Sequence, residues 1–144
     1  MTKPKPAEKG QSLVEMALSA VLIIFLLMAT IDFGYAFLYW ITVRDAAQEG
    51  AVYGSLHPGP ACDTTLRARV KAANSSPLIR IDNLPDSQIV VTRTGNLPGN
   101  TINVKVTLYY QVLTPLVSQF LNNSQITLST NVTNTILQVD ASCP

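Results

Sequence analysis

A long apolar stretch lies near the start of the chain. Residues 16–31 are apolar apart from Ser19 and Thr30, and apolar residues continue from Phe33 to Trp40 after Asp32. A helix needs about 20 apolar residues to cross a bilayer core of about 30 Å. The pattern predicts a membrane span over about residues 16–40, with Asp32 in its outer third and an aromatic belt at its outer end.

Helical periodicity continues beyond this span. Small residues recur on one helix face, namely Ala46, Ala47, Gly50, Ala51 and Gly54, and Pro58 and Gly59 end the pattern. The sequence predicts one helix over residues 11–57, with an exported stem over about residues 41–55. Such a small-residue stripe lets another backbone approach closely. The partner is either the chain's own sheet or a helix of another subunit, and the pattern leaves both open.

Residues 58–144 show shorter patterns. Residues 64–74 (TTLRARVKAAN) predict a short helix that Asp63 or Thr64 caps, with Arg67, Arg69 and Lys71 on a solvated face. Alternation predicts strands over residues 87–94, 101–110 and 125 to about 138. A short helix after Thr114-Pro115 is expected to carry Leu116, Val117, Phe120 and Leu121. The expected fold is α+β, with about three largely antiparallel strands that the long helix covers.

The charges that flank the apolar stretch predict its orientation in the membrane. Lys3, Lys5 and Lys9 precede the apolar stretch, whereas Arg44, Asp45 and Glu49 follow it. The positive-inside rule therefore predicts a cytoplasmic N-terminus and an extracytoplasmic domain. No small-x-small cleavage site closes the apolar stretch, so we expect the helix to be retained in the membrane. The net charge of +1 gives no basic field for nucleic acid.

The remaining chemistry is sparse. An exported domain suits a disulfide between Cys62 and Cys143, although two buried thiols are the alternative. His57, the only histidine, lies in a turn, and no catalytic set, phosphate loop or zinc site can be assembled. We therefore expect no enzyme activity, cofactor, metal or small-molecule substrate.

The sequence around Gly10 resembles a type IV prepilin leader. Lys9-Gly10 is followed by Gln11-Ser-Leu-Val-Glu15 and the apolar helix. The resemblance implies that a prepilin peptidase cuts between Gly10 and Gln11 and releases residues 1–10 as a cytoplasmic leader. Glu15 then pairs with an α-amine, either its own or that of a neighbouring subunit. The alternative is a helix-start carboxylate stabilised by the helix dipole.

A second resemblance is to the TadE-like pseudopilins of tight-adherence (Tad, Flp-type) pilus systems. It rests on GQSLVEMAL, IDFGYAF and AAQEGAVYGS, in this order, within about the first 55 residues. Met16 stands where major Flp pilins tend to have an aromatic residue, and those pilins are much shorter. The resemblance therefore implies a minor pseudopilin that contributes to pilus assembly and cell adhesion. Its implied partners are the bilayer, prepilin peptidase, other pilins and the Tad inner-membrane platform.

A different function remains open. A single-pass anchored domain that binds a partner without entering a filament needs the same membrane helix and the same exported domain. It has no use for Gly10 or Glu15, so these two residues separate the two hypotheses.

Overall fold

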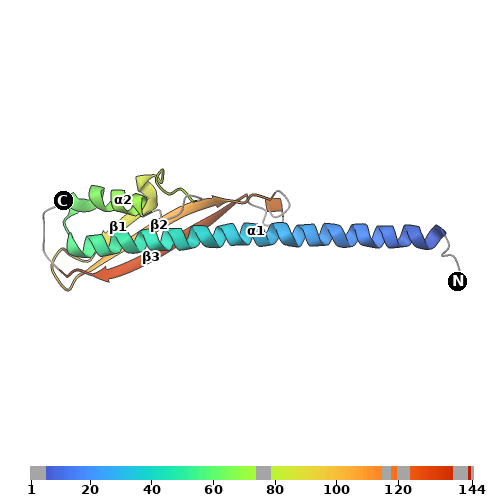
Figure 1. The fold of residues 1–144 in the computed structure, drawn as a ribbon. Coiled ribbons are helices and arrows are strands. Elements are labelled where there is room, and N and C mark those ends of the chain that lie inside the picture. Colours follow the sequence, from blue (N-terminus) through green and yellow to red (C-terminus); the bar gives the residue numbers. More distant parts are fainter. Residues whose placement is uncertain (1–5, 74–78, 115–117, 120–123, 138–142, 144) are drawn as a thin grey trace. The chain divides into compact units, whose positions relative to one another are not determined.

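A computed structural model describes residues 6–73, 79–114, 118–119, 124–137 and 143. The chain divides into two compact units. Unit 1 comprises Met1–Tyr35 and Val112–Ser124, and unit 2 comprises Ala36–Gln111 and Gln125–Pro144. In the described residues, the main elements are one long helix, one short helix and a three-stranded antiparallel sheet, so the predicted α+β class is confirmed (Figure 1).

Helix α1 runs over Pro6–Leu56, which is 51 residues. No proline interrupts the sequence between Pro6 and Pro58, and α1 ends just before Pro58, as predicted. The predicted bound at Gln11 follows the expected cut after Gly10, whereas in the uncut chain the helix begins five residues earlier, within the expected leader. Pro6 at the first helical position suits this start, since proline lacks only an N–H that has no partner in the first turn.

The sheet has the strand order β1-β2-β3. Strand β1 spans Ile89–Arg93, β2 spans Thr101–Gln111 and β3 spans Gln125–Thr135. In the register, Val104 of β2 lies opposite Val91 of β1 and Val132 of β3. The predicted outer strands were too long. β1 begins only after a 3-10 turn, η2 (Asp86–Gln88), and β3 ends at Thr135.

The core of unit 2 forms where the stem of α1, the second helix and β2 meet. The inward face of β2 is buried along its length, through Ile102, Val104, Val106, Leu108 and Tyr110. Its β3 neighbours, such as Leu128 and Val132, are only half-buried. Burial of alternate residues gives the sheet one apolar face, and the cover over this face is thinner at β3.

The second helix, α2, spans Asp63–Ala72 and follows a 3-10 turn, η1, at Pro60–Cys62. Cys62, not Asp63 or Thr64, occupies the N-cap position and makes no side-chain capping hydrogen bond. The predicted cap is therefore wrong, and Asp63 instead forms an ion pair with Arg93 of β1. Leu66 and Val70 form the buried face of α2.

The predicted helix after Thr114-Pro115 lies largely outside the described residues. Leu116, Val117, Phe120 and Leu121 belong to the parts that are not described. The described pair 118–119 is helical, and the Ser118 N–H donates to the Thr114 carbonyl at 3.1 Å.

Candidate functional site

The N-terminal sequence motif lies within α1. Gly10, Gln11 and Glu15 are all exposed, and nothing lies within 4 Å of a Cβ built on Gly10. The Gln11 side-chain amide donates to Glu15 Oε1 at 3.5 Å. Because Gln11 and Glu15 are four residues apart, they lie on one helix face. The Glu15 carboxylate is thus accessible and lies one helical turn from the backbone nitrogen of Gln11.

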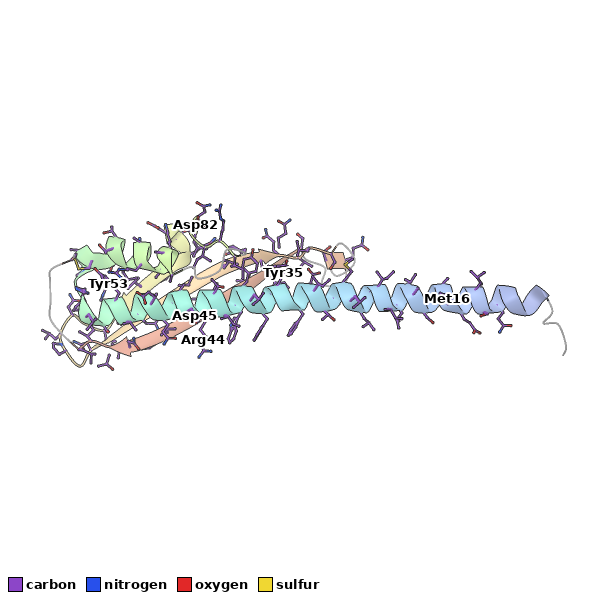
Figure 2. All side chains as sticks on the ribbon, viewed as in Figure 1. Met16, Tyr35, Arg44, Asp45, Tyr53 and Asp82 are labelled. Carbon is purple, nitrogen blue, oxygen red and sulfur yellow. A yellow bond between two sulfur atoms is a disulfide. The ribbon has the colours of Figure 1, made fainter. Side chains whose placement is uncertain are left out.

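The apolar part of α1 presents its side chains outward. Large side chains from Leu13 to Phe37 are mostly exposed in the chain, and Met16 projects away from the helix (Figure 2). Among the described residues, one helical stretch, Gly10–Leu56, is long and apolar enough to cross a membrane. An apolar surface of this length has a lipid or protein environment that the single chain does not supply.

Asp32 interrupts this apolar surface. Its carboxylate accepts the Leu113 N–H at 3.1 Å and the Thr114 N–H at 3.2 Å, and the Thr114 hydroxyl also donates to it. All of these groups belong to unit 1. The sequence analysis placed Asp32 in the membrane span and in the IDFGYAF stretch but did not predict these contacts. A lone acid in an apolar helix indicates that a partner exists, yet the partner is about eighty residues away in sequence.

The small-residue stripe is buried inside unit 2. Ala46, Ala47, Gly50, Ala51 and Gly54 are all buried in the single chain. A Cβ on Gly50 would lie 2.5 Å from Val70 Cγ2 and 3.3 Å from Val104 Cγ1, and one on Gly54 would overlap Ile102. Of the two partners that the sequence left open, the stripe therefore packs on the chain's own second helix and sheet.

The two cysteines form the predicted disulfide. Cys62 and Cys143 are bonded, with their Cα atoms 5.3 Å apart and a sequence separation of 81. Cys62 is buried at the end of η1, and Cys143 lies near the C-terminus of the chain. The bond closes most of unit 2 into one loop and suits an oxidising compartment.

The cations of α2 take part in ion pairs that the sequence did not predict. Lys71 Nζ lies 2.6 Å from Asp86 Oδ1, and Arg67 lies 3.9 Å from the same carboxylate. The hydrogen bond and charge of Lys71 lower the pKa of Asp86 below its usual value, and Arg67 adds to this. Arg69 lies 3.9 Å from Glu49 of α1 and stacks over Tyr53 at 5.4 Å. These cations therefore bind acids of their own chain.

The described residues hold no group of three or more His, Cys, Asp or Glu side chains placed to bind a metal. An open groove in unit 2 is lined by Asp45, Glu49, Arg69, Ala72 and Ala73, so its charged groups include the Glu49–Arg69 pair. The His57 ring stacks on Tyr53 with centroids 4.5 Å apart, so His57 packs on the last turn of α1.

Comparison with known proteins bears on the N-terminal part of the chain. Residues 10–52 match the family model described as TadE-like protein. This segment is TadE-like, as its sequence predicted. The match contains Gly10–Glu15, Asp32–Gly34 and the stripe from Ala46 to Ala51. No curated protein and no solved structure matches the chain.

Proposed function

We propose that the chain is a minor pseudopilin of a Tad/Flp-type pilus or secretion system. Its N-terminal helix anchors it in the cell membrane, and it contributes to pilus assembly and adhesion through packing between subunits. The TadE-like match over residues 10–52 carries this proposal, because it contains both the leader junction and the exposed apolar helix. The N-terminus is cytoplasmic, and residues 58–144 form the extracytoplasmic domain.

Two surfaces support assembly. The apolar part of α1 is exposed over Leu13–Phe37, which suits lipid before assembly and neighbouring helices within a filament. The inward face of β3 is only half-buried, and residues 106–139 contain no Asp, Glu, Lys, Arg or His. Neutral, partly apolar surfaces favour contact-driven packing over electrostatic capture.

Processing is the first testable step. Prepilin peptidase cuts between Gly10 and Gln11, and the new α-amine of Gln11 becomes available to a carboxylate. Since Gly10 lies inside α1, the helix must open locally for the cut, and glycine lowers the helix propensity there by about 1 kcal/mol relative to alanine. Mass spectrometry of the membrane-extracted protein should show a chain that begins at Gln11 when active peptidase is present. An intact chain under those conditions refutes the proposal.

Assembly is the second step, and Glu15 tests it. The proposed partner of its carboxylate is the α-amine of a neighbouring subunit, because a charge near the bilayer boundary is stabilised by an opposite charge. Glu15→Ala should abolish incorporation into sheared pili while membrane insertion and cleavage persist. The matched control is Ser19→Ala, one turn further along the same exposed helix, which should incorporate normally.

The alternative function is a single-pass anchored domain that binds a partner without assembling. The exposed helix and the folded unit 2 fit this function equally well. Under it, Glu15→Ala leaves function and localisation intact, and the chain is absent from sheared pili. The pair of Glu15 and Ser19 variants therefore separates the two functions.

A further inference from the structure

Asp32 is buried where the rest of the helix is exposed. It is 5% exposed, whereas its neighbours Ile31 and Phe33 are 50% and 73% exposed. A buried carboxylate is costly unless hydrogen-bond donors compensate for the water that it loses. The donors here are the backbone N–H groups of Leu113 and Thr114 and the Thr114 hydroxyl. Asp32 therefore fixes the chain just after β2 to this level of α1.

The same contacts supply hydrogen-bond acceptors for the backbone just after β2. The Val112 N–H still donates across the hairpin to the Ser124 carbonyl at 3.0 Å. The next two amides, of Leu113 and Thr114, donate to Asp32 instead. Irregular backbone exposed to lipid is not found in the hydrocarbon core, because lipid offers no hydrogen-bond partners. This segment therefore lies at or outside the boundary of the bilayer's hydrocarbon core, and Asp32 lies there with it.

The length of the helix agrees with this position. Leu13 to Ile31 is about 19 residues, or about 28 Å at 1.5 Å per residue, which is close to a bilayer core of about 30 Å. The hydrocarbon core of the bilayer then ends at Asp32, and Phe33 and Tyr35 lie in the interfacial layer that aromatic side chains favour. This boundary is closer to the N-terminus than the 16–40 window that periodicity predicts.

We propose that Leu113 inserts into the outer interfacial layer of the bilayer and that Asp32 is the residue that positions it there. The Leu113 side chain is 63% exposed in the chain, although its backbone is fixed to Asp32. The hydrogen bond to Asp32 joins the Leu113 backbone to the exposed apolar part of α1, which the membrane already covers in the proposed function. Because residues 106–139 carry no Asp, Glu, Lys, Arg or His, the contact is apolar and does not depend on anionic headgroups.

The test uses the full chain in lipid vesicles and tryptophan as the probe. Trp40, the only tryptophan, is first replaced by Phe. Leu22→Trp, Leu113→Trp and Leu97→Trp are then made separately, at sites that are 62%, 63% and 66% exposed. Vesicles of phosphatidylcholine, with or without phosphatidylglycerol, carry acyl chains brominated near the headgroup or near the bilayer centre.

The expected result is a different profile at each site. Leu22→Trp should be quenched by both lipids and more by deep bromines. Leu113→Trp should be quenched by shallow bromines, with blue-shifted emission, equally with and without phosphatidylglycerol. Leu97→Trp, in the turn between β1 and β2, should resemble tryptophan in water. Quenching at Leu22 without quenching at Leu113 overturns the proposal and leaves membrane anchoring intact, whereas loss of quenching at both refutes the anchoring on which the proposal rests.

The role of Asp32 is tested in the Leu113→Trp and Leu22→Trp backgrounds. Asp32→Ala removes the acceptors of the Leu113 and Thr114 amides and should abolish shallow quenching at residue 113 while leaving quenching at residue 22 unchanged. Asp32→Asn keeps one acceptor oxygen and should restore part of the signal. Full quenching at residue 113 in the Asp32→Ala variant would show that Asp32 does not position Leu113.

Discussion

At the scale of single residues, two glycines decide how closely α1 approaches its neighbours. Gly50 and Gly54 are helical, and a Cβ on either would meet Leu66 of α2 and a β2 side chain within 3.5 Å. Glycine in a helix interior costs about 1 kcal/mol relative to alanine. The close packing of α1 on α2 and β2 explains why the chain carries this cost twice within one turn.

Gly50→Ala is expected to destabilise unit 2 by up to about 2 kcal/mol. The added methyl group would overlap Val70, whose branched side chain has little rotamer freedom, and overpacking of this kind costs about 1–3 kcal/mol. The better helix propensity of alanine offsets about 1 kcal/mol of it. Urea unfolding of the full chain in detergent measures the difference.

Gly59→Ala is the matched control for Gly50→Ala. Gly59 has φ −65°, and only Cys62 Sγ lies near a Cβ built there, at 3.9 Å. The Gly59→Ala protein should be as stable as the original chain or slightly more stable, because alanine restricts the unfolded chain. If Gly50→Ala unfolds at the same urea concentration as Gly59→Ala, the packing described for the stripe is wrong.

The Asp86 ion pair predicts a pH dependence at the same scale. Lys71 lowers the pKa of Asp86 from its usual 3.8, so the stabilisation is complete above that value and is lost as the pH falls through the lower folded pKa. Lys71→Met should therefore be less stable than the original chain at neutral pH. The two proteins should converge below the pKa of Asp86, as measured by thermal unfolding across an acid pH series. A constant difference across that series would contradict the prediction.

At the scale of elements, α1 meets two environments along one helix. Its N-terminal part presents apolar side chains outward, whereas its stem buries Val43, Ala47 and Ala51 inside unit 2. The sheet has a corresponding asymmetry, because β2 is fully covered on its inward face and β3 is not. The Cys62–Cys143 bond joins the segment after α1 to the segment that follows β3.

Reduction of the disulfide is expected to destabilise unit 2 by up to about 4 kcal/mol, because a loop of this length restricts the unfolded chain strongly. Urea unfolding with and without dithiothreitol measures the loss. Cys143→Ser, at the exposed end of the bond, should match the reduced protein and show no further response to dithiothreitol. A response that persists in this variant would mean that dithiothreitol acts elsewhere.

At the scale of the whole molecule, unit 2 contains its own core. The buried side chains from Val43 to Ile136 include residues of α1, α2 and all inward positions of β2. The Leu137 N–H donates to the Ser55 carbonyl at 3.0 Å, so the segment after β3 also binds the stem within unit 2. The fold of this unit therefore needs the stem of α1 but not its apolar part.

A fragment of residues 36–144 is expected to fold without the membrane helix. Its β2 amides should exchange as slowly with solvent deuterium as those of the full chain, because their partners in β1 and β3 remain. The Leu113 and Thr114 amides should exchange faster, since Asp32 is absent. Fast exchange throughout β2 would show that the two units fold only together.

Local sequence patterns determined much of this protein's secondary structure and fold class. The spacing of hydrophobic residues predicted helix α1 and its end before Pro58, the inward face of β2 and the α+β class. These features depend on residues that are neighbours within one element. The motif around Gly10 and Glu15 also identified the TadE-like segment without a structure. Element ends were less accurate, as at Cys62 and Thr135, since capping and pairing partners lie elsewhere in the chain.

Only the tertiary structure decided the contacts between distant residues. The sequence showed a lone Asp32, a stripe of small residues and three cations on α2, and each pattern was compatible with several partners. The structure gave Asp32 the amides of Leu113 and Thr114, and it gave Lys71 the carboxylate of Asp86. It also packed Gly50 against Val70 within one chain. Periodicity determines which face of an element is apolar, but the fold decides what that face meets.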